Sequence, residues 1–465
     1  MASNKEVVVA MVPFVTQGHL NQLLHLSRII SAYNLPVHFI CTATHIRQAR
    51  LRVHGPNSQN DNNNNIIFHE LPDLDFISPP PNPNGPNGFP SHLIPSINSS
   101  LNLRGPVADI IRSLSKTSRR VAVVHDSAMS YVVQDVKMIP NAETYVFRAL
   151  SVFYSFCFSF ERLGKEIPFE NETIRKIPTS AETMSREFLE FVKIQYSHQT
   201  FHVGNIYDSS RAIEGRFLEK LEKDEIYGKN HWAVGPFNGV KKLETDISAS
   251  SQNRDTSLQW LDKQPSKSVI YVSFGTTTTF TDEQIKELAI GLEKSGQRFL
   301  WVLRDADKGD VFKNEEGKGV GLPKGFEERV QGRGLVVRKW APQVEILGHS
   351  ATAGFVSHCG WNSCMEALTA GVPIATWPFH SDQPRNAFLL VDVLGVALTM
   401  KEWASRNEVL TSAKVEEVIR KLMDTKEGTM IKKRAADLGD DLRRSMDEDG
   451  VTSKELDSLI SYIRR

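Results

Sequence analysis

The 465-residue chain has only four cysteines, Cys41, Cys157, Cys359 and Cys364, and they are scattered along it. So few thiols cannot form the disulfide framework of a small secreted domain, and their scarcity is typical of the reducing cytosol. An excess of charge of one sign is also lacking, because Lys plus Arg and Asp plus Glu number 55 each. Without a net positive field, neither nucleic acid nor an anionic membrane surface is an expected partner.

Long hydrophobic runs are absent as well. The N-terminus has neither the basic start nor the small-residue cleavage site of a signal peptide. The most apolar later stretch, residues 149–160, contains three serines and is shorter than the roughly 18 residues that a bilayer span requires. We therefore expect a cytoplasmic protein without a membrane span.

Short apolar runs alternate with helical patterns along the whole chain. In the N-terminal half the predicted strands are 7–12, 37–40, 66–71, 121–124, 144–147 and 232–236. In the C-terminal half they are 269–274, 299–303, 335–337, 354–357, 373–377 and 396–400, separated by helical patterns such as 282–294, 361–369 and 415–423. Repetition of strand and helix predicts parallel sheets that are covered by helices on both faces.

A polar stretch near residues 241–255 separates the two series of strands. We expect an α/β protein of two doubly wound parallel-sheet domains, 1–238 and 257–465, joined by a linker at 239–256. The last helix is expected to pack back on the N-terminal domain. Ligands of such folds bind beyond the carboxyl ends of the strands, so the predicted site is the cleft between the domains. Low-complexity loops at 57–65 and 78–90 are predicted to be mobile and to lie on the surface.

Motifs of several other enzyme classes are missing. There is no dinucleotide fingerprint after a strand, no phosphate-binding P-loop and no serine nucleophile elbow. Asp73 with Asp75, and Asp305 with Asp307, have the Asp-x-Asp spacing of a metal site, but both pairs stand in loops that do not favour one. His358, Cys359 and Cys364 lack the second ligand pair of a zinc site. We expect no metal and no cofactor.

The stretch from Trp340 to Gln383 carries a dense motif. It contains Trp340-Ala-Pro-Gln343, His358-Cys-Gly-Trp-Asn-Ser363, Glu366, Gly371-Val-Pro373 and Asp382-Gln383 at fixed spacing. It resembles the donor-binding signature of plant secondary-product UDP-sugar glycosyltransferases. The resemblance implies the two-domain GT-B fold, UDP-glucose as co-substrate bound by the C-terminal half, and an inverting, metal-independent hexosyl transfer.

The residue types in this stretch fit a nucleotide sugar. The indole of Trp340 can stack on uracil, and the amide of Gln343 can bond the uracil or the ribose. A strand at 354–357 leads through His358 into a helix, whose free N–H groups and partial positive charge suit a diphosphate. One turn beyond Ser363, Glu366 can accept the ribose hydroxyls. The resemblance implies a UDP-sugar site of Thr276, Trp340, Ala341, Gln343, His358, Trp361, Asn362, Ser363, Glu366, Asp382 and Gln383, with the last two on the sugar hydroxyls and His358, Asn362 and Ser363 on the phosphates.

Two residues of the N-terminal half match the family's catalytic pair. His19 follows the first predicted strand as a helix opens, and Asp126 ends the strand that begins at residue 121. Parallel strands place both at one edge of the sheet, where the carboxylate can fix the tautomer of the imidazole. The helix N-terminus is expected to disfavour the imidazolium form and to keep His19 neutral. The resemblance implies that His19 is the base that deprotonates the acceptor hydroxyl.

Several stretches in both halves are similar to zeatin O-glycosyltransferases. They are Gly18-His-Leu-Asn-Gln22, which lacks the proline usual in the wider family, Ser273-Phe-Gly-Thr-Thr-Thr-Thr279 and His380-Ser-Asp-Gln-Pro-Arg385. This likeness implies a zeatin-type cytokinin as the small-molecule acceptor, glucosylated on its side-chain hydroxyl. We expect the enzyme to be a monomer. The alternatives are a flavonoid, isoflavone or other phenolic O-glucosyltransferase, a zeatin O-xylosyltransferase, and a non-catalytic nucleotide-sugar-binding protein.

Overall fold

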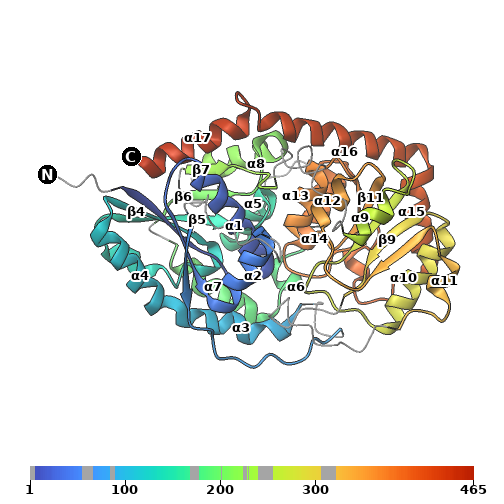
Figure 1. The fold of residues 1–465 in the computed structure, drawn as a ribbon, viewed down its shortest axis with the longest axis horizontal. Coiled ribbons are helices and arrows are strands. Elements are labelled where there is room, and N and C mark those ends of the chain that lie inside the picture. Colours follow the sequence, from blue (N-terminus) through green and yellow to red (C-terminus); the bar gives the residue numbers. More distant parts are fainter. Residues whose placement is uncertain are drawn as a thin grey trace.

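The computed structural model describes residues 6–54, 66–83, 89–167, 177–199, 202–223, 228, 230–238, 255–304 and 321–465. Two parallel sheets, each between layers of helices, lie side by side (Figure 1). Residues 57–65, Asp305, Asp307 and nearly all of the predicted linker lie outside the described residues, as do residues 84–88 of the predicted loop at 78–90.

The N-terminal sheet has seven strands in the order β3-β2-β1-β4-β5-β6-β7, all parallel. The strands are β1 (Val7–Val12), β2 (Val37–Thr42), β3 (Ile66–Leu71), β4 (Arg120–Asp126), β5 (Ala142–Arg148), β6 (His202–Tyr207) and β7 (Asn230–Ala233). The helices of this half are α1 (Gln17–Ser31), α2 (Ala43–His54), α3 (Ile94–Ser99), α4 (Arg104–Thr117), α5 (Val152–Arg162), α6 (Ser180–Thr183), α7 (Arg186–Ser197) and α8 (Arg211–Lys223).

The C-terminal sheet has six parallel strands in the order β10-β9-β8-β11-β12-β13. The strands are β8 (Val269–Ser273), β9 (Arg298–Val302), β10 (Gly334–Val337), β11 (Thr352–Ser357), β12 (Ile374–Thr376) and β13 (Ala397–Thr399). The helices are α9 (Thr256–Leu261), α10 (Asp282–Ser295), α11 (Phe326–Arg329), α12 (Gln343–Gly348), α13 (Trp361–Thr369), α14 (Gln383–Phe388), α15 (Ser412–Asp424), α16 (Lys426–Ser445) and α17 (Val451–Arg464).

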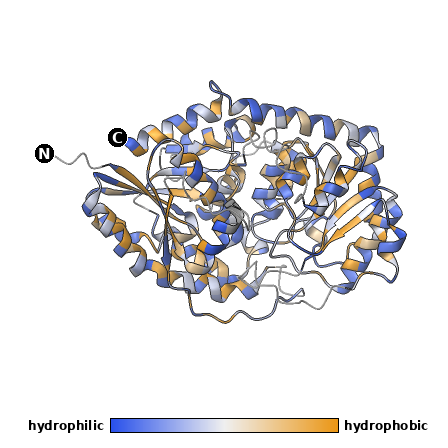
Figure 2. Ribbon diagram, viewed as in Figure 1, coloured by the Kyte–Doolittle hydropathy of each residue, from blue (hydrophilic) through white to orange (hydrophobic). Residues whose placement is uncertain are grey.

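The continuous apolar runs of the sequence become strands that are buried on both faces. In β1, Val7, Val9 and Met11 enter one apolar core, whereas Val8 and Ala10 enter the core on the opposite face of the sheet. Successive side chains of a strand alternate between faces, so a strand covered on both sides needs apolar residues at every position. Figure 2 shows the hydrophobic strands inside and mixed helices around them. The predicted α/β fold with two parallel sheets is confirmed.

Two features of the N-terminal sheet differ from the predictions. Strand β6 was not predicted, because Gly204 and Asn205 interrupt its apolar run. Gly204 is required there, since a Cβ would lie 2.6 Å from the ring of Trp232. The predicted strand at 232–236 is instead Asn230–Ala233, and the chain has left the sheet before Pro236.

The two halves also share packed surfaces. Most of the apolar stretch at 149–160 lies in α5, whose Phe153 stacks on Phe388 of the C-terminal half with ring centroids 5.8 Å apart. Helix α16 and helix α17 run along one side of both halves (Figure 1), and Trp232 of β7 donates from its indole to Ser458 of α17. Among the described residues, no helix combines the length and the apolar character of a membrane span.

Candidate active site

A cavity of about 1480 Å³ lies between the two halves. It is lined from the N-terminal half by α1, α5 and α7, and from the C-terminal half by the segments that follow β8, β10, β11 and β12. All the predicted site residues except Asp126 line it. Parallel strands end at the edges that face this cavity, which is why residues so distant in sequence meet there.

His19 and Asp126 form a hydrogen-bonded pair at the edge of the N-terminal sheet. The Nδ1 atom of His19 lies 2.7 Å from Oδ2 of Asp126, which is fully buried, whereas 27% of the His19 side chain is exposed. The other carboxylate oxygen of Asp126 accepts from the backbone N–H of Ala128 at 2.8 Å. With Nδ1 donating to the carboxylate, Nε2 of His19 is left as the ring atom that can accept a proton.

The protonation of His19 differs from the prediction. Burial lowers the pKa of His19, but the charge and hydrogen bond of Asp126, together with the charge of Asp382, outweigh burial and raise it above 6.5. The direction of the shift is therefore opposite to the one expected from the helix N-terminus, because nearby carboxylates stabilise imidazolium more than burial disfavours it. A raised pKa makes His19 a stronger base at pH values where it is unprotonated.

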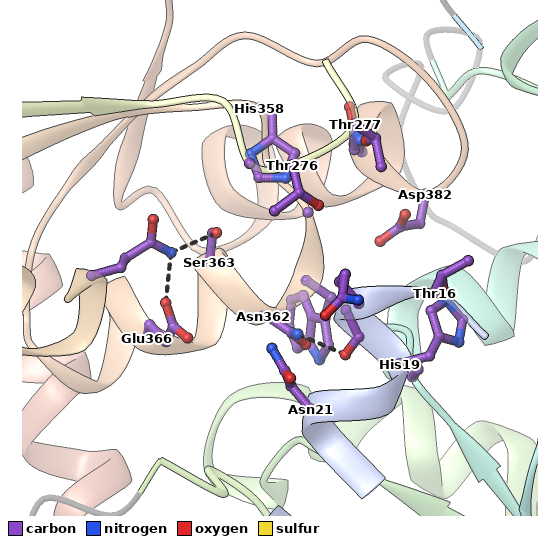
Figure 3. A pocket seen from close by; sticks show the side chains of 18 of the residues that line it. Thr16, His19, Asn21, Thr276, Thr277, His358, Asn362, Ser363, Glu366 and Asp382 are labelled. Carbon is purple, nitrogen blue, oxygen red and sulfur yellow. Dashed lines mark hydrogen bonds between the residues drawn. The ribbon is translucent and has the colours of Figure 1, made fainter. Parts of the chain in front are cut away.

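The turn from β11 into α13, which contains the residues predicted to contact phosphate, borders the cavity. Cys359 has φ of 65°, uncommon for a residue with a side chain, and is held by Ser357 Oγ, which accepts from its N–H. The first residues of α13 line the cavity, and their N–H groups have no partner within the helix. Gly275, after β8, also borders this turn, since a Cβ there would lie 2.8 Å from Nε2 of His358. Figure 3 shows His358 beside Thr276, the residue that follows this glycine.

His358 is neutral near pH 7, because burial lowers its pKa to about 4. Its Nδ1 atom is buried and has no hydrogen-bond partner among the described residues. An unpaired ring nitrogen beside a helix N-terminus is suited to bond an anionic ligand by donating a hydrogen, not by carrying a charge.

Gln343, Ser363 and Glu366 are joined in one network. The Gln343 amide donates to Ser363 Oγ at 2.8 Å and to Glu366 Oε2 at 2.6 Å (Figure 3). Asn238 donates to the other oxygen of Glu366 at 3.2 Å. Burial, with the nearby charges of Asp208 and Glu345, raises the pKa of Glu366 to about 7. Ser363 and Glu366 thus share one face of α13, as their spacing predicts.

We expect Glu366→Ala to raise the donor KM by about 10- to 100-fold with little change in kcat, because hydroxyl contacts to a carboxylate hold ground and transition states alike. Initial rates at varied UDP-sugar measure this, with the exposed Glu417→Ala as the control. Since protonation removes the accepting charge, the wild-type donor KM should also rise as the pH falls through about 7. An unchanged donor KM in Glu366→Ala would remove Glu366 from the donor site.

The aromatic residues of the motif have different roles. Trp340 lies three residues beyond β10, not at its end, and is 55% exposed at the cavity, so its indole is free to stack on a flat base. Trp361 is buried and donates its indole N–H to the carbonyl of Asp208 at 2.8 Å, which anchors the first residue of α13 to the N-terminal half. Ala341 is buried beside the cavity.

Asp382 and Gln383 are held in place by short local bonds. Asn386 donates to Asp382 at 2.6 Å, and burial raises the pKa of Asp382 to about 6. The Gln383 carbonyl oxygen accepts from the backbone N–H groups of Phe379 and His380, at 2.9 and 3.3 Å. One hydrogen of the Gln383 NH₂ group faces Nε2 of His380 at 3.4 Å, which leaves the other hydrogen as a donor for a ligand.

The side chain of Asn362 points to the N-terminal half. Its amide nitrogen donates to the carbonyl of Gly18 at 2.8 Å, and its oxygen accepts from Gln22 of α1. Figure 3 shows Asn362 facing α1. The Asn362 side chain thus links α13 to α1, the helix that carries His19. The phosphate contact predicted for Asn362 would have to compete with these bonds. Gln22 was not predicted as a site residue. It ends the stretch Gly18-His-Leu-Asn-Gln22, which lacks the proline usual in the wider family, and this departure could have drawn attention to it.

The acceptor side of the cavity was not predicted residue by residue. Its wall is mainly aromatic and apolar, and one face of α7 contributes Phe188, Val192, Gln195 and Tyr196. These residues follow one another at intervals of four, three and one, which is the spacing of one face of a helix. The sequence could therefore have indicated that they share a face. Phe14 also lines this side, and its ring packs on His19 with centroids 5.3 Å apart. Within the described ranges, no group of three or more His, Cys, Asp and Glu is arranged to hold a metal ion.

Two parallel-sheet domains, with a histidine–aspartate pair on one side of the cleft and a helix N-terminus on the other, define a nucleotide-sugar transferase. Residues 5–239 match the family described as glycosyltransferase, N-terminal domain, and residues 229–434 match UDP-glucoronosyl and UDP-glucosyl transferase. The chain belongs to this family of UDP-glycosyltransferases.

The chain is similar over its whole length to curated members of the family. It is 50% identical to a zeatin O-glucosyltransferase of Phaseolus lunatus, covering 99% of this chain and 97% of the relative. It is also 50% identical to a zeatin O-xylosyltransferase of Phaseolus vulgaris, covering 100% of both. Among solved structures, it matches a UDP-glucosyltransferase from Polygonum tinctorium capable of glucosylating indoxyl, with a TM-score of 0.77, 26% identity and 100% of both chains covered.

Proposed function

We propose that this enzyme transfers glucose from UDP-glucose to the side-chain hydroxyl of a zeatin-type cytokinin, with inversion at the anomeric carbon and without a metal ion. The His19–Asp126 pair, which opens into the cavity that also contains the donor motif, carries the catalytic part of the proposal. The identity of 50% to a zeatin O-glucosyltransferase supports the acceptor.

In the proposed reaction His19 acts as general base. Its Nε2 takes the proton of the acceptor hydroxyl while Asp126 stabilises the imidazolium that forms. The hydroxyl oxygen forms a bond to the anomeric carbon as the bond from that carbon to the UDP oxygen breaks, with oxocarbenium character between the two. A single displacement inverts the centre, so a UDP-α-sugar gives a β-glycoside and UDP.

The C-terminal half stabilises the leaving group. Negative charge develops on the UDP oxygen, and the first residues of α13, whose N–H groups have no partner within the helix, line the cavity. The neutral ring of His358 adds a hydrogen-bond donor. These fixed donors take the role that a divalent cation has in metal-dependent transferases.

Sequence identity does not decide the sugar, because the relatives with 50% identity include both a glucosyl- and a xylosyltransferase. The proposal of glucose therefore rests on Gln383. With its carbonyl oxygen bound to backbone N–H groups, Gln383 presents a donor that can pair with a hydroxyl which a hexose has and a pentose lacks. One amide hydrogen faces His380, and leaving the other buried without a partner costs about 1–3 kcal/mol, so we expect UDP-glucose to be preferred by roughly 10- to 100-fold. Zeatin O-xylosyl transfer is the second candidate function.

One experiment tests the proposal. Purified enzyme is given UDP-glucose or UDP-xylose with trans-zeatin, cis-zeatin, dihydrozeatin, a flavonol or an isoflavone, with and without EDTA, and the products are identified. We expect a zeatin with UDP-glucose to give the highest kcat/KM, the sugar on the side-chain oxygen, and no effect of EDTA. A phenolic turned over far faster than every zeatin, a preference for UDP-xylose, or loss of activity in EDTA that added metal restores would each refute the corresponding part.

A further inference from the structure

One polar group stands out in the aromatic wall of the acceptor side. Gln195 of α7 is only 1% exposed and lines the cavity together with Phe188 and Val192 of the same helix face. Its carbonyl oxygen accepts from the backbone N–H of Tyr131 at 3.0 Å, whereas its Nε2 atom is buried and has no hydrogen-bond partner in the part of the chain that the structure describes.

The bond to Tyr131 fixes the direction of the amide. Rotating the amide by 180° would place its NH₂ group against the backbone N–H, so the nitrogen must remain the free end. Tyr131 follows the short turn Ser127–Met129, whose N-terminus is capped by Asp126. Gln195 is therefore tied to the same segment that holds the carboxylate of the catalytic pair, and its position relative to His19 is set.

A buried amide donor without a partner is unfavourable, and a ligand in the cavity that Gln195 lines can provide the acceptor atom. The surrounding aromatic side chains, which include Phe14, Tyr154 and Phe158, suit a flat ring. We propose that Gln195 selects heteroaromatic acceptors, its Nε2 donating a hydrogen bond to an in-plane nitrogen of the bound ring and thereby directing the hydroxyl to His19. This inference rests on the proposed zeatin-type acceptor, whose ring is a purine, and adds the group that recognises this ring.

The test separates recognition from a merely structural role by two substitutions. Gln195→Glu keeps the oxygen that accepts from Tyr131 but replaces the NH₂ donor, whereas Gln195→Leu removes both. If Gln195 only held the fold, Glu would be tolerated better than Leu, and every acceptor would be affected alike. Gln134→Leu is the matched control, because Gln134 is also buried and donates to the carbonyl of Tyr131 at 2.8 Å but does not line the cavity.

The probe is zeatin without its hydroxyl, N6-isopentenyladenine, with binding measured by calorimetry in the presence of UDP. We expect both Gln195 variants to bind it about 10- to 100-fold more weakly, Glu at least as weakly as Leu, and Gln134→Leu to bind it within about threefold of the wild type. The 1-deaza, 3-deaza and 7-deaza forms of the probe each lack one ring nitrogen. One of them should bind the wild type as weakly as the unmodified probe binds the Gln195 variants, and its affinity should not fall further in Gln195→Glu.

The inference is overturned if the wild type does not bind the probe, if all three deaza forms bind as tightly as the probe, or if Gln195→Glu binds it normally. Equal losses for a flavonol and for the probe would also overturn it. Since the probe carries no hydroxyl, these outcomes do not depend on transfer. Failure of zeatin as a substrate would instead refute the proposed function.

Discussion

His19→Ala is expected to lower kcat by about 10²–10⁴-fold and to leave the affinity for UDP within about threefold of the wild type. A side-chain hydroxyl of the aliphatic type is barely acidic, so its oxygen becomes a nucleophile only as a base removes the proton. His19 lies on α1 of the N-terminal half, whereas the network of Gln343, Ser363 and Glu366 lies in the C-terminal half. Initial rates with saturating substrates measure the first quantity, and calorimetry with UDP measures the second.

His25→Ala is the matched control for this experiment. His25 lies on the same helix and lines the same cavity, but the histidine paired with Asp126 is His19. We expect the control to retain most of the activity. Turnover by His19→Ala within about threefold of the wild type would refute the base assignment, and a large loss of UDP affinity would show that the two halves do not act separately.

The fold could be predicted because apolar runs in a parallel sheet are nearly continuous. Residues Val7 to Val12 read as a strand from the sequence since both faces of β1 are buried. Strand β6 could not be found in this way, because Gly204 is required by close contact with Trp232, a residue distant in sequence. When a residue is required by a contact with a distant part of the chain, as Gly204 is, the apolar pattern of the local sequence does not indicate the strand.

More residues of the site could be predicted on the donor side of the cavity than on the side formed by α7. The donor side follows a dense motif, and the pairing of His19 with Asp126 follows from parallel strands ending at one edge. The direction of the His19 pKa shift was predicted wrongly, because the charge and hydrogen bond of Asp126, with a smaller effect of Asp382 from the other half, together outweigh burial. Gln195 belongs to no motif, and only the folded cavity shows that its nitrogen is unpaired.

Asp126→Asn is expected to lower kcat by about 10- to 10³-fold, less than the loss of the base itself. Asparagine has nearly the same size but no charge, and it can donate to Nδ1 of His19, which favours the tautomer whose Nε2 carries a proton and cannot accept one. The carbonyl oxygen of the substituted amide can still accept from the N–H of Ala128, so the turn after β4 should be kept. Rates and thermal unfolding of the variant measure the two effects.

The pH profile identifies how Asp126 acts. Catalysis needs unprotonated His19, so the rate is lost as the pH falls through its pKa, and the wild-type acid limb should lie above pH 6.5 because that pKa is raised. In Asp126→Asn the charge and hydrogen bond that raise the pKa are gone, while burial, which lowers it, remains and only Asp382 still opposes it. The acid limb of kcat should therefore move to lower pH as the plateau falls. A lower plateau with an unmoved limb would mean that Asp126 only positions the ring, and a limb moved to higher pH would contradict the electrostatic role altogether.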